Sequence, residues 1–211
     1  MLPIFTAKEI HSIVGGKLYN GDCEINGVSI DSRNIKKNEL FVAIKSKRDG
    51  HDFILSAIKK GAIAAILNRI PSDLPSNFTC ILVKDSLSAI KAIAHYSRRR
   101  YKGKLIAITG SVGKTSTKDI LTKMLSAFGS THSSPKSFNN HLGVPLTLAN
   151  IPKDTKFVVC EIGMNSKGEI APLSKLASPD TAIITNISAA HMKSFKNLQE
   201  IAQEKSGPCA G

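Results

Sequence analysis

The stretch Lys104-Leu-Ile-Ala-Ile-Thr-Gly-Ser-Val-Gly-Lys-Thr-Ser116 decides how the second half of this chain folds. Its apolar first half, residues 104–109, predicts a short buried strand. Residues 116–128 predict a helix, because apolar residues recur there at helical spacing: Ile120, Leu121, Met124, Leu125 and Phe128. A strand, a glycine-rich turn and a helix N-terminus direct backbone N–H groups at one point, where the helix dipole also favours anions. The stretch therefore predicts a phosphate-binding loop.

A nucleoside triphosphate is the ligand that such a loop binds most often. Lys114 would place a positive charge at the β- and γ-phosphates, and the Thr115 hydroxyl could ligate Mg²⁺. The usual pattern has glycine at position 108, where this chain has Ile108, and a Gly-Lys-Thr tripeptide by itself also occurs in ordinary turns. The flanking strand and helix favour nucleotide binding. The residues expected around the phosphates are Thr109, Gly110, Ser111, Val112, Gly113, Lys114, Thr115 and Ser116.

Composition indicates a globular protein. Hydrophobic residues make up 42% of the 211 residues and charged residues 21%, which argues against disorder. No apolar run approaches the ~20 residues that span a bilayer. The N-terminus lacks the pattern of a secretion signal, and the four cysteines are far apart, so we expect a cytoplasmic protein with free thiols.

The net charge of +13 raises the question of a nucleic-acid partner. The densest basic cluster is Arg98-Arg-Arg-Tyr-Lys-Gly-Lys104. Most of the other basic residues are scattered lysines, and only 5% of residues are aromatic. We therefore expect no nucleic-acid partner, and an anionic small-molecule substrate accounts for part of the charge.

Two α/β regions follow one another along the chain. Thr6 and Glu9 predict a capping box on a helix that ends near Val14. Strands are expected at 27–31, 40–44, 62–67 and 80–84, with a helix at 51–60. Domain boundaries are predicted at 1–84 for a small α/β domain, 85–103 for a connector helix, and 104–211 for part of a parallel-sheet domain.

The second region alternates strands and helices, with later strands at 156–162 and 181–187 and a helix at 168–177. This order implies right-handed βαβ units and a parallel sheet, which binds ligands beyond the carboxyl ends of its strands. Thr109, Glu161 and Asn186 lie at those ends.

Three features beyond the loop carry possible chemistry. Glu161 ends an apolar strand, where a carboxylate could hold Mg²⁺ beside a phosphate or merely cap a loop. His191 follows the third strand, and a lone histidine is usually a solvated or core residue. The polar stretch Ser137-Phe-Asn-Asn-His-Leu-Gly-Val-Pro145 by itself indicates only a loop.

Together these segments resemble the Mur ligases, the ATP-dependent amide-forming enzymes of peptidoglycan precursor synthesis. The resemblance is carried by Ile108-Thr-Gly-Ser-Val-Gly-Lys-Thr-Ser116, Phe138-Asn-Asn-His-Leu-Gly-Val-Pro-Leu146, Glu161-Ile-Gly-Met-Asn-Ser-Lys-Gly-Glu-Ile170 and Thr185-Asn-Ile-Ser-Ala-Ala-His191. The family has a shortened phosphate loop, which accounts for Ile108. The Asn-Asn pair and the Glu161 segment look like those of the member that joins D-alanyl-D-alanine to UDP-N-acetylmuramoyl-tripeptide.

The N-terminal region is similar to the uridine-nucleotide-binding domain of the later Mur ligases. That similarity is carried by Val28-Ser-Ile-Asp-Ser-Arg33, Leu40-Phe-Val-Ala-Ile44 and Asp49-Gly-His-Asp-Phe53. It implies a fold with a UDP-binding N-terminal α/β domain and a partial P-loop ATPase domain.

The resemblance also implies roles for particular residues. Thr115 and Glu161 would hold a first Mg²⁺. His191 would lie at a second metal, together with Lys205, which falls where the family has a lysine that becomes carbamylated. Lys114, His191 and Lys205 would be catalytic. The substrate contacts would come from Ser32, Arg33 and Lys45 at the UDP group and from Asn139 and Asn140 at the nucleotide-sugar side of the cleft.

Three departures from the family pattern matter. Ser46 replaces a usual glycine, and the tail Ser206-Gly-Pro-Cys-Ala-Gly211 replaces an apolar helix continuation. Members of the family are about twice as long, so we expect a truncated, weakly active or inactive monomer. A helix should begin near Asn197 with Leu198, Ile201 and Ala202 on its buried face, and Lys205 should be exposed, flexible and unmodified.

Two alternatives stay open. The chain could be a sister amide ligase, either of another Mur type or related to folylpolyglutamate synthetase, or a basic P-loop ATPase that depends on nucleic acid. The sequence does not distinguish lysine from diaminopimelate as the third residue of the peptide substrate.

Overall fold

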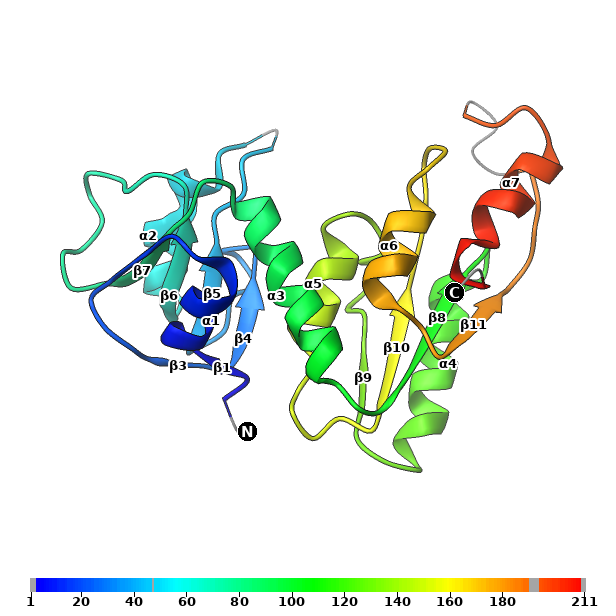
Figure 1. Ribbon diagram of the computed structural model, residues 1–211, viewed down its shortest axis with the longest axis horizontal. Coiled ribbons are helices and arrows are strands. Elements are labelled where there is room, and N and C mark those ends of the chain that lie inside the picture. Colours follow the sequence, from blue (N-terminus) through cyan, green and yellow to red (C-terminus); the bar gives the residue numbers. More distant parts are fainter. Residues whose placement is uncertain (1–2, 47, 190–193, 210–211) are drawn as a thin grey trace. The chain divides into compact units, whose positions relative to one another are not determined.

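The computed structural model of the protein describes residues 3–46, 48–189 and 194–209. The chain forms two compact units, Met1–Tyr96 and Ser97–Gly211, each built on its own sheet (Figure 1). The division falls inside helix α3 (Ser86–Arg100), within the stretch predicted as a connector. The α/β class is confirmed.

The first unit has a mixed sheet with strand order β2-β7-β6-β5-β4, in which only β2 runs antiparallel to its neighbour. A separate antiparallel pair joins β1 to β3. The elements are β1 (Phe5–Thr6), α1 (Ala7–Val14), β2 (Lys17–Tyr19), β3 (Glu24–Ile25), β4 (Gly27–Ser29), β5 (Glu39–Val42), the 3₁₀ helix η1 (Gly50–Phe53), α2 (Ile54–Lys59), β6 (Ala62–Leu67) and β7 (Thr79–Leu82).

Several of these elements were predicted from local sequence patterns. Strand β6 is buried on both faces, as a parallel strand in the middle of a sheet requires, and its uninterrupted apolar sequence follows from that burial. The predicted capping box of α1 is confirmed, with the Glu9 N–H donating to Thr6 Oγ1 (3.2 Å) and the Thr6 N–H donating to Glu9 Oε2 (2.8 Å). Strands β1, β2 and β3, of two or three residues each, were not predicted.

The second unit has a fully parallel sheet with strand order β11-β8-β10-β9. Helix α4 covers one face, where Leu121 and Leu125 pack against Ile106, Ile108 and Val159. Side chains alternate between the faces of a sheet, so the other face belongs to α5 and α6, which contact each other and the strands. The elements are β8 (Lys104–Thr109), α4 (Lys114–Ser126), β9 (Thr131–Ser133), α5 (Gly143–Ala149), β10 (Phe157–Glu161), α6 (Ile170–Ala177), β11 (Thr181–Ile184), α7 (Leu198–Lys205) and the 3₁₀ helix η2 (Gly207–Cys209).

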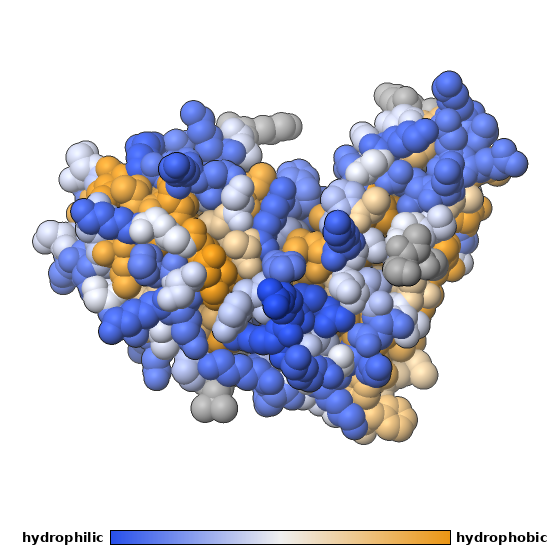
Figure 2. All heavy atoms as spheres, in the orientation of Figure 1, coloured by the Kyte–Doolittle hydropathy of each residue, from blue (hydrophilic) through white to orange (hydrophobic). Residues whose placement is uncertain are grey.

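The apolar residues of α4 do not all face the core. Ile120, Met124 and Phe128 are 62%, 60% and 70% exposed, and Figure 2 shows hydrophobic side chains at the surface along this helix. Ile120 and Met124 form their own stripe at i and i+4, rotated about 100° from Leu121 and Leu125, and Phe128 lies just beyond the end of the helix at Ser126. The spacing predicted the helix correctly but not which side of it meets the sheet.

Helix α5 was not predicted, and its first residues fall in the stretch interpreted as a loop. Every one of its residues is buried, so its sequence carries no polar face and no helical period. Pro145 is tolerated because it lies in the first turn, where backbone N–H groups have no partner within the helix.

The arginine cluster at the end of α3 serves the fold of the second unit. Arg98 donates from Nε to the Ala177 carbonyl (2.7 Å) and from Nη2 to the Ser178 carbonyl (2.6 Å), where α6 ends. Arg100 donates to the Ile151 carbonyl at 3.1 Å. A cation at the C-terminus of a helix satisfies unpaired carbonyls and interacts favourably with the helix dipole.

No helix within the described ranges has the length and hydropathy needed to cross a membrane.

Replacing Arg98 by alanine should destabilise the second unit, because two charged hydrogen bonds to the end of α6 are lost. We expect the free energy of unfolding to fall by about 1.5–3 kcal/mol, measured by urea denaturation. The matched control is Arg99→Ala, which removes an exposed arginine of the same cluster and should have little effect. Equal stability of both variants would contradict this role.

Candidate nucleotide-binding site

The phosphate loop joins β8 to α4 with two glycines at positive φ, Gly110 (144°) and Gly113 (82°). Gly110 also lies so close to Thr185 that a Cβ atom at position 110 would collide with the Thr185 hydroxyl. Both conformation and space therefore require glycine at position 110.

The segment after β11 fixes the first part of this loop. The Ser111 N–H donates to the Asn186 carbonyl and the Val112 N–H donates to Asn186 Oδ1, both at 3.0 Å. Thr185 Oγ1 donates to the Val112 carbonyl at 2.6 Å, and the Ser188 N–H donates to Ser111 Oγ at 3.0 Å. The sequence placed Asn186 at a strand end but gave neither Thr185 nor Ser188 a role.

The second part of the loop is free to bind an anion. The first hydrogen bond of α4 runs from the Thr117 N–H to the Gly113 carbonyl at 2.9 Å. The N–H groups of Lys114, Thr115 and Ser116 precede it and have no partner within the helix. Within the predicted loop, the N–H groups without a partner in the helix therefore lie at the start of α4, whereas the Ser111 and Val112 N–H groups donate to Asn186.

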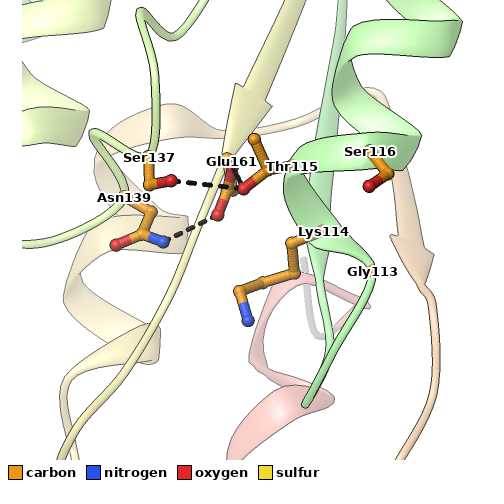
Figure 3. A pocket seen from close by; sticks show the side chains of 7 residues that line it. All are labelled: Gly113, Lys114, Thr115, Ser116, Ser137, Asn139 and Glu161. Carbon is orange, nitrogen blue, oxygen red and sulfur yellow. Dashed lines mark hydrogen bonds between the residues drawn. The ribbon is translucent and has the colours of Figure 1, made fainter.

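A cavity of ≈ 270 Å³ is lined in part by residues at the start of α4 (Figure 3). Its wall includes the carboxylate of Glu161, which is 1% exposed. Glu161 Oε2 accepts from Thr115 Oγ1 (3.0 Å), and Oε1 accepts from Asn139 Nδ2 (2.7 Å). Ser137 Oγ lies 3.3 Å from Thr115 Oγ1. The lining residues are Gly113, Lys114, Thr115, Ser116, Ser137, Asn139 and Glu161.

The groups around Glu161 fit Mg²⁺. No ion pair to this buried carboxylate occurs among residues 3–46, 48–189 and 194–209, so its partners there are neutral donors. Carboxylate and hydroxyl oxygens suit Mg²⁺, which usually takes one or two carboxylates and completes its shell with water and phosphate. The described residues contain no cluster of three histidine, cysteine or acidic side chains.

Lys114 is one of the residues that line this cavity. Its Nζ donates to the Gly110 carbonyl (2.8 Å) and to the Ser111 carbonyl (3.3 Å). A second cavity of ≈ 230 Å³ shares Lys114 and Asn139 with the first. It is also lined by Asn140, whose Oδ1 accepts from the Leu142 and Gly143 N–H groups at the start of α5. The other lining residues are Gly163, Met164, Asn165 and Glu169.

The prediction that Lys205 is exposed and flexible is wrong. Lys205 is 1% exposed, and its Nζ donates to the Gly110 carbonyl at 2.9 Å. Helix α7 begins after Asn197 as predicted, and its Glu204 accepts from the Ile170 N–H at the start of α6 (3.0 Å). The helix is thereby held on the sheet domain, although Leu198, predicted to be buried, is 48% exposed.

Burial lowers the pKa of Lys205 to about 8, and the neighbouring Lys114 ammonium acts in the same direction. Both lysines donate to the Gly110 carbonyl, so the Lys205 ammonium lies beside the phosphate loop. His191, the other residue assigned to a second metal, lies outside the described residues.

The residues expected to bind UDP lie in the first unit, after neighbouring parallel strands. Ser32 is buried and Arg33 is exposed, both following β4, and the exposed Lys45 follows β5. Arg33 forms a two-pronged pair with Asp31, Nε to Oδ1 and Nη2 to Oδ2, each 2.9 Å, which holds the pKa of Asp31 at about 2. Lys45 forms a single β-bridge with Asp49.

Comparisons with known proteins agree with this architecture. Residues 24–94 match the family model described as Mur ligase family, catalytic domain, and residues 108–207 match the Mur ligase middle domain. The chain belongs to the Mur ligase family. The two matches cover most of both structural units.

Close similarity extends to UDP-N-acetylmuramoyl-tripeptide–D-alanyl-D-alanine ligases. The enzyme of Rickettsia prowazekii is 41% identical over 202 residues, covering 96% of this chain and 44% of that protein. The Bacillus subtilis enzyme is 39% identical over 204 residues, covering 95% of this chain and 45% of that protein. The chain therefore spans less than half the length of these relatives.

Solved structures give the same relationship. A crystal structure of MurF from Acinetobacter baumannii matches with a TM-score of 0.81 at 30% identity, covering 98% of this chain and 47% of that one. MurF ligase from Thermotoga maritima in complex with ADP matches with a TM-score of 0.70 at 33% identity, covering 87% of this chain and 42% of that one.

Stability should depend on pH through Lys205. Because its pKa is lower in the folded chain than in the unfolded one, the unfolded state binds more protons between about pH 8 and 10.5. Charged, buried Lys205 therefore weakens folding below pH 8, and this penalty disappears as the pH rises to 10.5. The change is on the order of 3 kcal/mol.

The matched variant is Lys205→Met, which keeps the length of the side chain without its charge. Urea denaturation of both proteins from pH 7 to 10.5 should show their stability difference shifting in favour of the wild type as the pH rises. A difference that does not vary with pH would show that Lys205 titrates normally.

Proposed function

We propose that this chain supplies the UDP-binding and ATP-phosphate-binding parts of a ligase that joins D-alanyl-D-alanine to UDP-N-acetylmuramoyl-tripeptide. The observation that carries the proposal is the cavity between the N-terminus of α4 and the buried Glu161 carboxylate. Relatives of that name, about 40% identical over nearly the whole chain, support the choice of substrates.

The proposed ATP site lies at residues 113–116. Three N–H groups of the first turn of α4 would bind phosphate oxygens, and the helix dipole favours the negative charge there. Lys114, whose amine now donates to loop carbonyls, would turn to the phosphates. The Thermotoga relative was crystallised with ADP, which supports a nucleotide as the ligand.

In the proposed reaction, the tripeptide carboxylate attacks the γ-phosphorus of ATP and forms an acyl phosphate, with ADP leaving. The amine of D-alanyl-D-alanine then attacks the acyl carbon, the amide bond forms and phosphate leaves. Lys114 and the N–H groups would stabilise negative charge on the transferred phosphoryl group. Mg²⁺ held by Thr115 and Glu161 would neutralise part of that charge. Asn139 would orient the Glu161 carboxylate.

Lys205 is proposed to act as its carbamate. Carbamylation requires the neutral amine, which the lowered pKa of about 8 makes available near neutral pH. The negative carbamate would then replace a cation beside Lys114 and provide an oxygen ligand for a second metal, as in the family.

The UDP group is proposed to bind where β4 and β5 end, at Ser32, Arg33 and Lys45. Arg33 is exposed and already oriented by Asp31, so its guanidinium can bind a pyrophosphate oxygen at little cost in side-chain entropy. Asn139 and Asn140, which line the second cavity, are proposed as contacts for the nucleotide-sugar side of the substrate.

Replacing Lys114 by alanine should weaken ATP binding by about 10- to 100-fold, because a charged partner of the phosphates is lost. An NMR titration of the 211-residue chain with Mg²⁺ and ATP, followed at the amides of residues 113–116, measures even weak affinities. Lys123→Ala removes an exposed lysine of the same helix and is the matched control. Unchanged affinity in Lys114→Ala would refute the proposed ATP site.

Addition of UDP-N-acetylmuramoyl-tripeptide should shift the NMR signals of Ser32, Arg33 and Lys45, because these residues are proposed to meet the UDP group. Arg33→Ala should weaken that binding by about 10-fold or more, since one charged hydrogen-bond partner is lost. Arg48→Ala, which removes an exposed arginine of the same unit, is the control. Shifts confined to residues 109–115 would contradict the proposed UDP site.

A further inference from the structure

Lys118 is a buried lysine to which no role is yet attached. It lies on α4 one turn after Thr115, so the two side chains share one side of the helix. Lys118 is 2% exposed, whereas Lys123 on the same helix is exposed. A buried ammonium is costly unless its N–H groups have partners, so the positions of those partners are informative.

The partners of Lys118 are carbonyls of the loop between β9 and α5. Nζ donates to the Lys136 carbonyl at 2.8 Å and to the Ser134 carbonyl at 2.9 Å. It also lies 3.0 Å from Oδ1 of Asp119, an exposed neighbour on the helix. The Lys118 ammonium therefore ties α4 to two points of one loop.

That loop leads directly to the Glu161 cavity. Ser134 lies beside β10, with its Oγ accepting from the Glu161 N–H at 3.0 Å. Lys136 has φ at 51°, a left-handed conformation that is unfavourable for residues other than glycine. In this conformation the Lys136 carbonyl accepts from the Lys118 ammonium. Ser137 is the next residue and contacts Thr115, and Asn139 follows two positions later and contacts Glu161 (Figure 3).

We propose that Lys118 is a positioning residue of the Glu161 cavity. Its ammonium holds residues 134–136 against α4, which keeps Lys136 left-handed and brings Asn139 to Glu161 and Ser137 to Thr115. An apolar side chain of the same size could fill the space but would leave two carbonyls without a donor. The proposal concerns how the cavity is built, and it holds whichever anion or metal the cavity binds.

The experiment compares Lys118→Met, Lys118→Arg and the exposed control Lys123→Met by NMR, without nucleotide and well below the unfolding transition. In Lys118→Met, the side-chain amide of Asn139 should shift and exchange with water about 10-fold faster, as expected for a weakened hydrogen bond. Lys118→Arg, which can donate to both carbonyls, should restore most of the protection. Lys123→Met should match the wild type.

A folded Lys118→Met protein with an unchanged Asn139 amide would overturn the proposal, even if its melting temperature were lower. If Lys118→Met does not fold, a measurement on the wild-type protein provides a second test of the proposal. The Lys118 ammonium, held by two carbonyls, should give a proton–nitrogen signal protected from exchange, while that of Lys123 should exchange rapidly. An unprotected Lys118 ammonium would also overturn the proposal. All of these measurements are made without ligand. A negative result would therefore contradict the proposed role of Lys118 without contradicting the proposed ATP site.

Discussion

The parallel register of β10, β8 and β11 is the constraint on which the candidate site depends. Glu161 pairs with Ile108 at the end of β8, and Ile184 pairs with Thr109, so all three strands end at the same level of the sheet. Parallel strands bring chain segments that are far apart in sequence to one edge, where the loops that follow them meet. The phosphate loop thus lies between a carboxylate on one side and the segment after β11 on the other.

Buried charge in the second unit is balanced mainly by backbone groups. Lys118 donates to carbonyls between β9 and α5, and Lys114 and Lys205 donate to carbonyls of the phosphate loop. Glu161 has hydroxyl and amide partners in the described part of the chain. Three buried or partly buried lysines that donate to carbonyls thus lie in the same unit as a buried carboxylate whose described partners are neutral donors.

The basic character of the chain therefore has several structural sources. Arg98 and Arg100 stabilise carbonyls at the ends of helices and loops, as Lys118 does in the interior. Arg33 lies exposed beside Asp31 after a strand of the first unit. Clusters of arginine in a sequence can thus indicate helix ends as readily as a polyanion, because an unpaired carbonyl attracts the same group that a phosphate does.

The sequence by itself determined the α/β class, most strands, the turn that joins β8 to α4, the α1 capping box and the start of α7, because these depend on local patterns of apolar residues, glycines and caps. It could not reveal α5, whose residues are all buried and so carry no period, nor which stripe of α4 meets the sheet. Only the tertiary structure decided that Lys205 is buried, since its partner Gly110 lies 95 residues away. The pairing of Asn186 with the loop is likewise a contact between distant segments, and its geometry is set by strand register rather than by any local signal.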